Sequence, residues 1–165
     1  MSRRDADHGP ALGDTRDTGV TEGRVSRSLK RAAQATLGGF MVFAGVGHLT
    51  FAREEFQAQV PPWVPLDPDP VVLASGVVEV AVGSALLLAW RQPVRAVVGA
   101  GTAALFVAVF PGNIAQLTEH RDAFGLDTDR ARAVRLLFQP VLIGWALWST
   151  DAVREWRRRR TTINS

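Results

Sequence analysis

The sequence contains no cysteine among its 165 residues. That absence excludes disulfide bonds, cysteine-ligated metal and iron–sulfur sites, and thiol catalysis, and it leaves the redox compartment open. An evident pair of haem ligands and a dinucleotide-binding glycine fingerprint are also lacking, so the chain has no self-sufficient catalytic motif, and we predict no metal site. No internal repeat is visible. Because no small-residue cleavage site follows the first apolar stretch, we expect no cleavable signal peptide.

Charge is unevenly distributed along the chain. The formal net charge is +3 and the isoelectric point is near 10.8, a balance that is also found in nucleic-acid-binding proteins. The basic residues lie beside apolar stretches instead of on a folded polar face, so we do not expect a nucleic-acid partner. The mean hydropathy of +0.06 averages polar ends with a strongly apolar middle.

Four apolar stretches predict an all-α integral membrane protein, a four-helix bundle in one domain spanning residues 32–150. The expected spans cover about 32–52, 71–90, 94–117 and 133–150. The second is uncharged except for Glu79, and a helix of that length rises about 30 Å, the thickness of the hydrocarbon core of a bilayer. The second and third lack the polar face that a soluble bundle requires. The fourth is the weakest, because its uncharged part begins only at Leu136.

The segments outside the spans are polar. Residues 1–31 are rich in Arg, Asp, Gly and Thr without apolar periodicity, which predicts a disordered cytoplasmic tail. Residues 151–165 predict a solvated basic tail that contacts anionic lipid headgroups. The connector 53–70 contains the segment VPPWVP, and its prolines predict a rigid, partly extended loop.

Basic residues predict the orientation of the spans. They are most numerous in three places that four spans would bring to one side of the membrane: the flank before the first span, the turn between spans two and three, and the C-terminal tail. The positive-inside rule therefore predicts that both termini are cytoplasmic in a multi-pass protein of the cell membrane.

Five polar residues from four different spans fall at similar depth, in the predicted outer half: His48, Glu79, Asn113, Arg135 and Gln139. The VPPWVP segment leaves the bundle on the same side. We therefore predict a polar pocket there, because an acid inside a membrane usually faces protein or water. Structural alternatives stay open: a Glu79–Arg135 salt bridge that locks helices, a His48 bond to neighbouring backbone, amides that satisfy carbonyls near Pro111 and Pro140, and an Arg135 that only reaches toward the interface.

Five motifs resemble those of the DoxX family of small four-helix bacterial membrane proteins: GVGHLTF (45–51), VPPWVP (60–65), SGVVEVAVGSALLL (75–88), VFPGNIAQ (109–116) and RLLFQPVLIGWALW (135–148). The sequence departs from the family pattern at Leu49, where an aromatic is preferred, and at residues 136–138, where a proline often stands. The resemblance implies a bacterial inner-membrane location and a link to redox complexes, with founding members that look like a membrane subunit of a thiosulfate:quinone oxidoreductase.

Three functions follow as hypotheses. In the first, the chain is a membrane subunit of a quinone-linked redox complex, in which His48 and Glu79 act on the bound headgroup as hydrogen-bond donor and proton-transfer group. Asn113, Arg135 and Gln139 then orient the quinone, and a partner protein supplies the electrons. In the second, the chain anchors a partner protein through its loop or tails. The third, a small transporter, ranks last because no repeated halves are evident. The sequence leaves homo-oligomerisation open.

Overall fold

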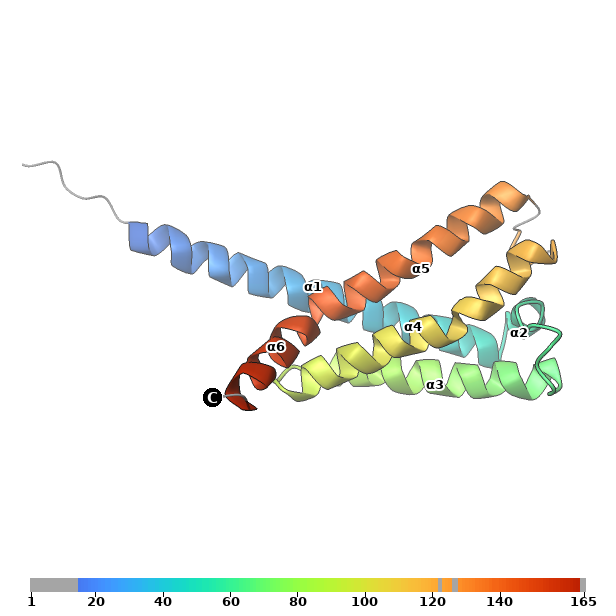
Figure 1. Cartoon of the computed structure of the whole chain (residues 1–165), viewed down its shortest axis with the longest axis horizontal. Helices are drawn as coiled ribbons and strands as arrows, with labels where there is room; N and C mark the ends of the chain where they lie inside the picture. Colours follow the sequence, from blue (N-terminus) through green and yellow to red (C-terminus); the bar gives the residue numbers. More distant parts are fainter. Residues whose placement is uncertain (1–14, 122, 126–127, 164–165) are drawn as a thin grey trace, which may run out of the picture.

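The computed structural model describes residues 15–121, 123–125 and 128–163. These ranges form six helices and no strand: α1 (Thr15–Leu49), α2 (Arg53–Gln57), α3 (Pro68–Leu88), α4 (Val94–Thr118), α5 (Asp129–Ser149) and α6 (Ala152–Ile163). The all-α prediction is therefore confirmed for the described part of the chain. The N-terminal part of α1 and the whole of α6 lie at one end of the molecule, and α2 lies at the opposite end (Figure 1).

The first helix corrects the prediction of a disordered tail over residues 1–31. Residues 15–31 are helical and run without a break into the first apolar stretch, while residues 1–14 lie outside the described residues. Extending an existing helix requires no new nucleus, and this segment contains no proline to stop it. Polarity alone therefore did not indicate disorder here.

Two further segments are more ordered than their composition indicates. The connector 53–70 opens with the short helix α2, because its prolines begin only at Pro61 and the Phe56 amide can donate to the Ala52 carbonyl at 3.1 Å. The basic tail forms α6, in which Arg159 pairs with Glu155 one turn earlier at 3.2 Å.

The long helices pack as two pairs. The most extensive contacts run along α1 and α3, and the next along α4 and α5. Toward the α2 end the α4–α5 pair diverges from the α1–α3 pair (Figure 1). Nearer the α6 end, the pairs share a core to which all four helices contribute: Leu37, Met41, Leu86, Ala103, Phe106 and Ala146.

A buried polar layer closes the bundle between this core and α6. The fully buried Gln34 side chain donates to the carbonyl oxygens of Leu86 and Ala89 at 2.7 and 2.9 Å. Its own oxygen accepts a bond from Arg95 Nε at 2.6 Å, and Arg95 also donates to the Ser149 carbonyl. By its sequence, Arg95 counts only among the basic residues between spans two and three that indicate orientation. The structure instead buries its side chain in this layer, where α1, α3, α4 and α5 meet.

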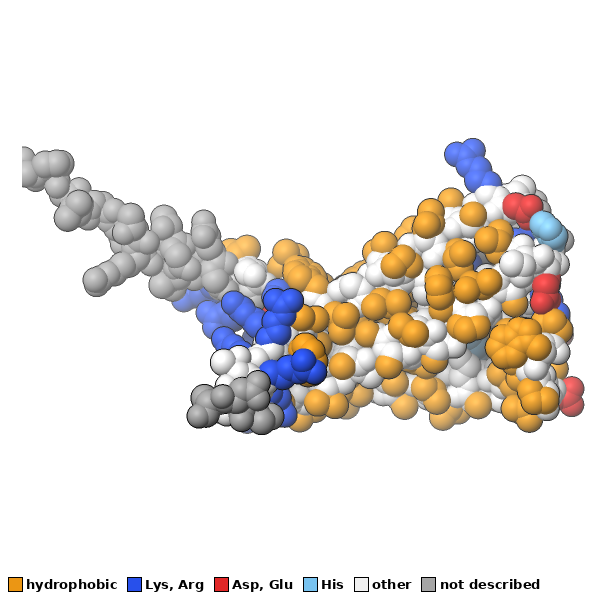
Figure 2. Space-filling model, viewed as in Figure 1, with side chains coloured by type: hydrophobic (Ala, Val, Ile, Leu, Met, Phe, Trp, Pro, Cys, Tyr) orange, Lys and Arg blue, Asp and Glu red, His pale blue; other side chains and the backbone are white. Residues whose placement is uncertain are grey.

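Within the described residues, three helical segments are long and apolar enough to cross a membrane: residues 24–49 of α1, α3 and α4. The fourth expected span meets that test only as part of a bent pair, α5 with α6, whose axes differ by 55°. On the face shown in Figure 2, hydrophobic side chains cover the middle, most of the visible Lys and Arg side chains gather at the α6 end, and acidic side chains and a histidine lie at the α2 end.

Candidate functional site

Glycines allow α1 and α3 to approach closely where they present His48 and Glu79. A Cβ atom added at Gly45 would lie 2.7 Å from the Gly76 carbonyl oxygen, and one added at Gly76 would lie 2.7 Å from the Cβ of His48. Any side chain at either position would therefore push the helices apart. Gly39, on another face of α1, meets nothing within 4 Å.

His48 and Glu79 lie side by side on the wall that α1 and α3 form. The His48 Nδ1 atom lies 2.9 Å from the Ala44 carbonyl oxygen and 3.3 Å from Glu79 Oε2. Because a carbonyl only accepts, Nδ1–H is directed to Ala44. The Ser75 hydroxyl, one turn before Glu79, donates to its carboxyl group. Glu79 Oε2 is buried and accepts no hydrogen bond within the described part of the chain.

Asn113 and Gln139 form the opposite wall, on α4 and α5. Asn113 Nδ2 donates to Gln139 Oε1 at 2.9 Å, and Gln139 Nε2 donates to the Phe106 carbonyl oxygen at 2.6 Å. Both side chains are buried. Of the two amides, Gln139 bonds to a backbone carbonyl, that of Phe106 on the neighbouring helix, whereas Asn113 bonds to a side chain.

Arg135 does not form the salt bridge with Glu79 that the sequence left open. Its guanidinium donates to Gln116 Oε1 at 3.0 Å and lies 5.3 Å from the centre of the Phe124 ring. Among the described residues, Arg135 forms no ion pair with a carboxylate. Its contacts are with α4 and the loop that follows α4, whereas Glu79 lies beside His48.

The end of α2 and the segment that follows it cover the space between the two walls. The Phe56 ring stacks on the His48 ring with centroids 3.3 Å apart, and Phe124 meets Phe56 edge-on at 4.6 Å. On α4, a Cβ atom at Gly112 would lie 2.7 Å from the Gln59 carbonyl oxygen, so glycine lets this segment rest on the helix. We call residues 56–64 the roof.

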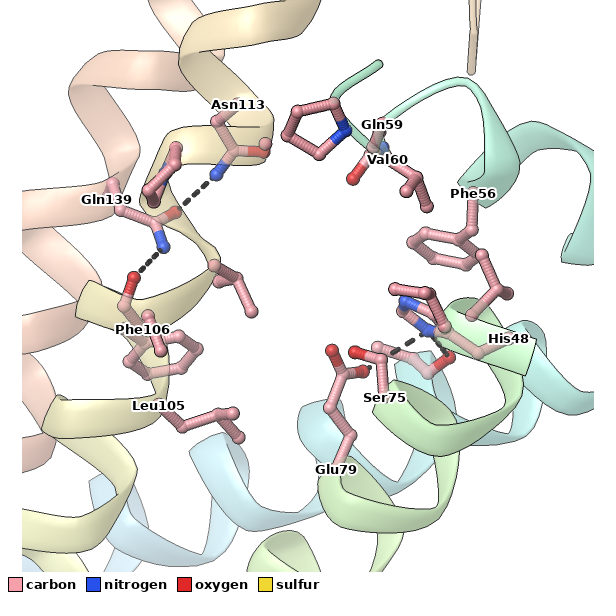
Figure 3. Close-up of a pocket in the computed structure, with 18 of the residues that line it drawn as sticks. His48, Phe56, Gln59, Val60, Ser75, Glu79, Leu105, Phe106, Asn113 and Gln139 are labelled. Atoms are coloured by element: carbon pink, nitrogen blue, oxygen red, sulfur yellow. Dashed lines mark hydrogen bonds and ion pairs between the residues drawn. The ribbon is translucent and has the colours of Figure 1, made fainter. Parts of the chain in front are cut away.

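These walls and the roof enclose a cavity of about 640 Å³ at the α2 end of the bundle (Figure 3). Its lining is largely apolar, and the VPPWVP segment contributes four residues to it. All five residues singled out from the sequence line the cavity: His48, Glu79, Asn113, Arg135 and Gln139. The structure thus brings them together from four helices. Their assignment as catalytic or headgroup-binding residues stays a prediction.

Sequence reasoning missed several residues of the site. Ser75 was not among the predicted site residues, although its spacing of one helical turn from Glu79 is the signal for a local hydrogen bond. Phe56 and Gln59 lie on the roof, and no pattern in the sequence pairs them with α1 or α4. Among the described residues, no group of three or more His, Cys, Asp and Glu side chains is placed to hold a metal ion.

Comparison with known families corrects the expected relationship. The resemblance to the DoxX family is wrong as a family assignment, because the family whose model matches is a different one, and the implied thiosulfate:quinone oxidoreductase loses its support. Searches of curated proteins and of solved structures found no match. The matching family model covers residues 37–150, which include the five polar residues of the cavity, all of α3, α4 and α5, and the end of α1 from residue 37. The chain therefore belongs to the family described as domain of unknown function (DUF8561).

Proposed function

We propose that the protein spans the membrane as a four-helix bundle of α1, α3, α4 and α5, and that it binds a small lipophilic molecule in the cavity at the α2 end. Exposed apolar side chains on all four helices support the membrane placement, among them Phe43, Val77, Val97 and Leu137, each at least 59% exposed. The Lys and Arg side chains at the α6 end support an orientation with that end and both termini in the cytoplasm.

The proposal of ligand binding is carried by one observation: every hydrogen bond or ion pair of the five polar residues lies within one helix pair. His48 meets Glu79 inside the α1–α3 pair, whereas Asn113, Gln139 and Arg135 bond inside the α4–α5 pair. Residues that served only to lock the bundle would be expected to bond across it. A mainly apolar cavity with a few converging polar groups is the usual form of a small-molecule site.

The two walls favour a ligand with polar atoms at opposite ends of a flat apolar body. On one wall, the buried Glu79 Oε2 has no hydrogen-bond partner among the described residues. An ionised Glu79 would accept a hydrogen bond from the ligand there, and a protonated Glu79 would donate one. On the other wall, the Arg135 guanidinium and the Asn113 amide supply donors near the roof. A quinone has this shape and a carbonyl acceptor at each end, so it is the first probe we would use.

The test of binding is a titration of the protein in lipid nanodiscs with ubiquinone and menaquinone analogues. Glu79→Leu removes both the donor and the acceptor, so we expect saturable binding that this change weakens by roughly tenfold, the effect of one hydrogen bond. The control Glu54→Leu removes an exposed acid outside the cavity and should bind as the wild type does. Leu105→Trp should fill the cavity and block binding, and Val107→Trp, on the exposed face of the same helix, should not.

Absence of binding in the wild type and in every variant, with Glu79→Leu merely less stable, would contradict the proposal. That outcome would favour the alternative of a membrane anchor for a partner protein. The observation in favour of an anchor is the exposed edge of the loop between α2 and α3, where Trp63 and Leu66 are 67% and 64% exposed. Copurification with wild type and with Trp63→Ala would then identify whether this edge holds a partner.

The absence of cysteine makes the orientation directly testable, because a single introduced cysteine has no background. We expect Leu66→Cys to react with a membrane-impermeant maleimide in intact cells. Arg91→Cys, in the turn between α3 and α4, should react only after the membrane is opened. The reverse pattern would overturn the orientation, and full reaction of both in intact cells would overturn the membrane placement.

A further inference from the structure

A second hollow lies at the α6 end, far from the cavity. It is a groove of about 690 Å³ between α1, the end of α5 and α6, lined by Lys30, Leu147, Trp148, Asp151, Val153, Arg154, Arg157, Arg158 and Thr161. Nothing in the proposed ligand site uses these residues. The groove combines basic side chains with an apolar floor, and this combination indicates what it binds.

Asp151 holds the groove open by setting the direction of α6. Its backbone adopts a left-handed conformation, with φ of 58°, which Asp tolerates better than most residues. Its carboxylate forms an ion pair with Lys30 on α1 and lies 3.6 Å from Arg95 on α4. The sharp turn and these two partners fix α6 at 55° to α5, where it packs against α4.

One face of α6 presents three arginines to the groove. Arg154, Arg157 and Arg158 are spaced three and four residues apart, so they share a helix face. None of the three forms an ion pair within the described part of the chain. The neighbouring Arg159 and Arg160 differ, because Arg159 pairs with Glu155 and Arg160 lies 3.7 Å over the Trp156 ring.

The floor of the groove is apolar and partly exposed. Trp148 and Val153 are 47% and 43% exposed, and Leu147 lies beside them. A free phosphate or a nucleic-acid backbone needs cations but no apolar floor. A phospholipid needs both, because its phosphodiester is joined directly to glycerol and acyl chains.

We propose that this groove binds an anionic phospholipid of the cytoplasmic leaflet. The phosphodiester lies against Arg154, Arg157 and Arg158, and the glycerol and first acyl carbons lie on Leu147, Trp148 and Val153. The α6 helix then lies along the membrane surface as an interfacial helix. The proposal rests on the membrane placement proposed above, but not on any ligand of the cavity.

The test is a titration of the detergent-solubilised protein with a short-chain phosphatidylglycerol, followed by native mass spectrometry. Arg154→Gln/Arg158→Gln should weaken binding by roughly 30-fold. The matched control Arg159→Gln/Arg160→Gln removes the same charge from the same helix outside the groove, and its binding should stay within about twofold of wild type. Arg154→Lys/Arg158→Lys keeps the charge and should retain most of the binding, which separates lost contacts from a misfolded helix.

Three results would overturn the proposal. Equal weakening by both double Gln variants would indicate diffuse attraction without a site. Equal binding of a short-chain phosphatidylcholine would show that the anionic headgroup is not recognised. Displacement by inorganic phosphate at the same concentration would assign the groove to free phosphate. Failure of the membrane placement itself would be seen separately, as protein in the soluble fraction of lysed cells.

Discussion

Replacing Gly45 by alanine tests whether close contact between α1 and α3 builds the cavity wall. The added Cβ would lie 2.7 Å from the Gly76 carbonyl oxygen and 2.8 Å from both the Val80 amide nitrogen and its Cγ2 atom. Two of these three atoms are backbone, so a rotamer change cannot relieve the clash. To restore contacts of about 3.5 Å, the helices would have to separate by roughly 0.8 Å.

Overpacking of this kind typically costs about 1–3 kcal/mol. The matched control is Gly39→Ala on the same helix, where the new methyl group meets nothing within 4 Å. That variant should be neutral or gain up to about 1 kcal/mol from the higher helix propensity of alanine. The assay is equilibrium unfolding in mixed detergent micelles, followed by tryptophan fluorescence, with the quinone titration as a second readout.

The clash should also displace His48, because the Cβ of His48 packs on Gly76 one helical turn further along. We therefore expect Gly45→Ala to weaken binding in the cavity as well as lower the free energy of unfolding. Equal stability of the two alanine variants would refute the close helix contact. A destabilised Gly45→Ala protein with unchanged binding would refute the claim that this contact positions the wall.

Three further predictions concern the polar contacts. Arg95→Leu removes the donors that join α4 to α1 and α5, and it should lower the free energy of unfolding in the same assay by roughly 1–3 kcal/mol; no change would mean that the layer is hydrated. Asn113→Leu leaves Gln139 Oε1 without its donor and should lower the free energy of unfolding by a similar amount. Unchanged stability with weaker ligand binding would mean that this hydrogen bond does not stabilise the fold. Arg121→Ala removes bonds to two roof carbonyls, so hydrogen exchange over 58–64 should accelerate while the long helices stay protected.

The sequence was sufficient to predict the apolar parts of the four long helices and to place the five polar residues near the same end of the bundle. Long uncharged runs predict helices, and alternating helix direction assigns a depth to each residue in the bundle. The hydrogen-bond and ion-pair partners of these residues could not be predicted in the same way. Depth does not determine the rotation of each helix about its axis, so Arg135 was one possible partner of Glu79, whereas the structure places Glu79 beside His48. Rotation depends on glycine contacts such as Gly45 with Gly76, which hydropathy does not register.

The ends of the chain show a second limit of sequence reasoning. Residues 15–31 and α6 are polar and basic, a composition that is equally compatible with a solvated coil and with an exposed helix. Within α6, Arg159 pairs with Glu155 one turn earlier, and between the segments Lys30 of α1 pairs with Asp151, the residue just before α6. That pair joins residues far apart in the chain, so no local pattern in either segment indicates it.

The two ends of the bundle differ in how the helix pairs are joined. At the α6 end, bonds cross between the pairs: Arg95 on α4 donates to Gln34 on α1, and the Trp145 indole on α5 donates to the Ala33 carbonyl at 3.0 Å. At the α2 end, the cavity residues bond only inside their own pairs, and the contacts between pairs are left to the loops of the roof. Because the helix pairs are hydrogen-bonded to each other at the α6 end, the distance between the pairs can change at the α2 end with little effect on the core. A ligand that contacts both Glu79 and Arg135 would connect the two pairs there, so binding should stabilise the α2 end more than the α6 end.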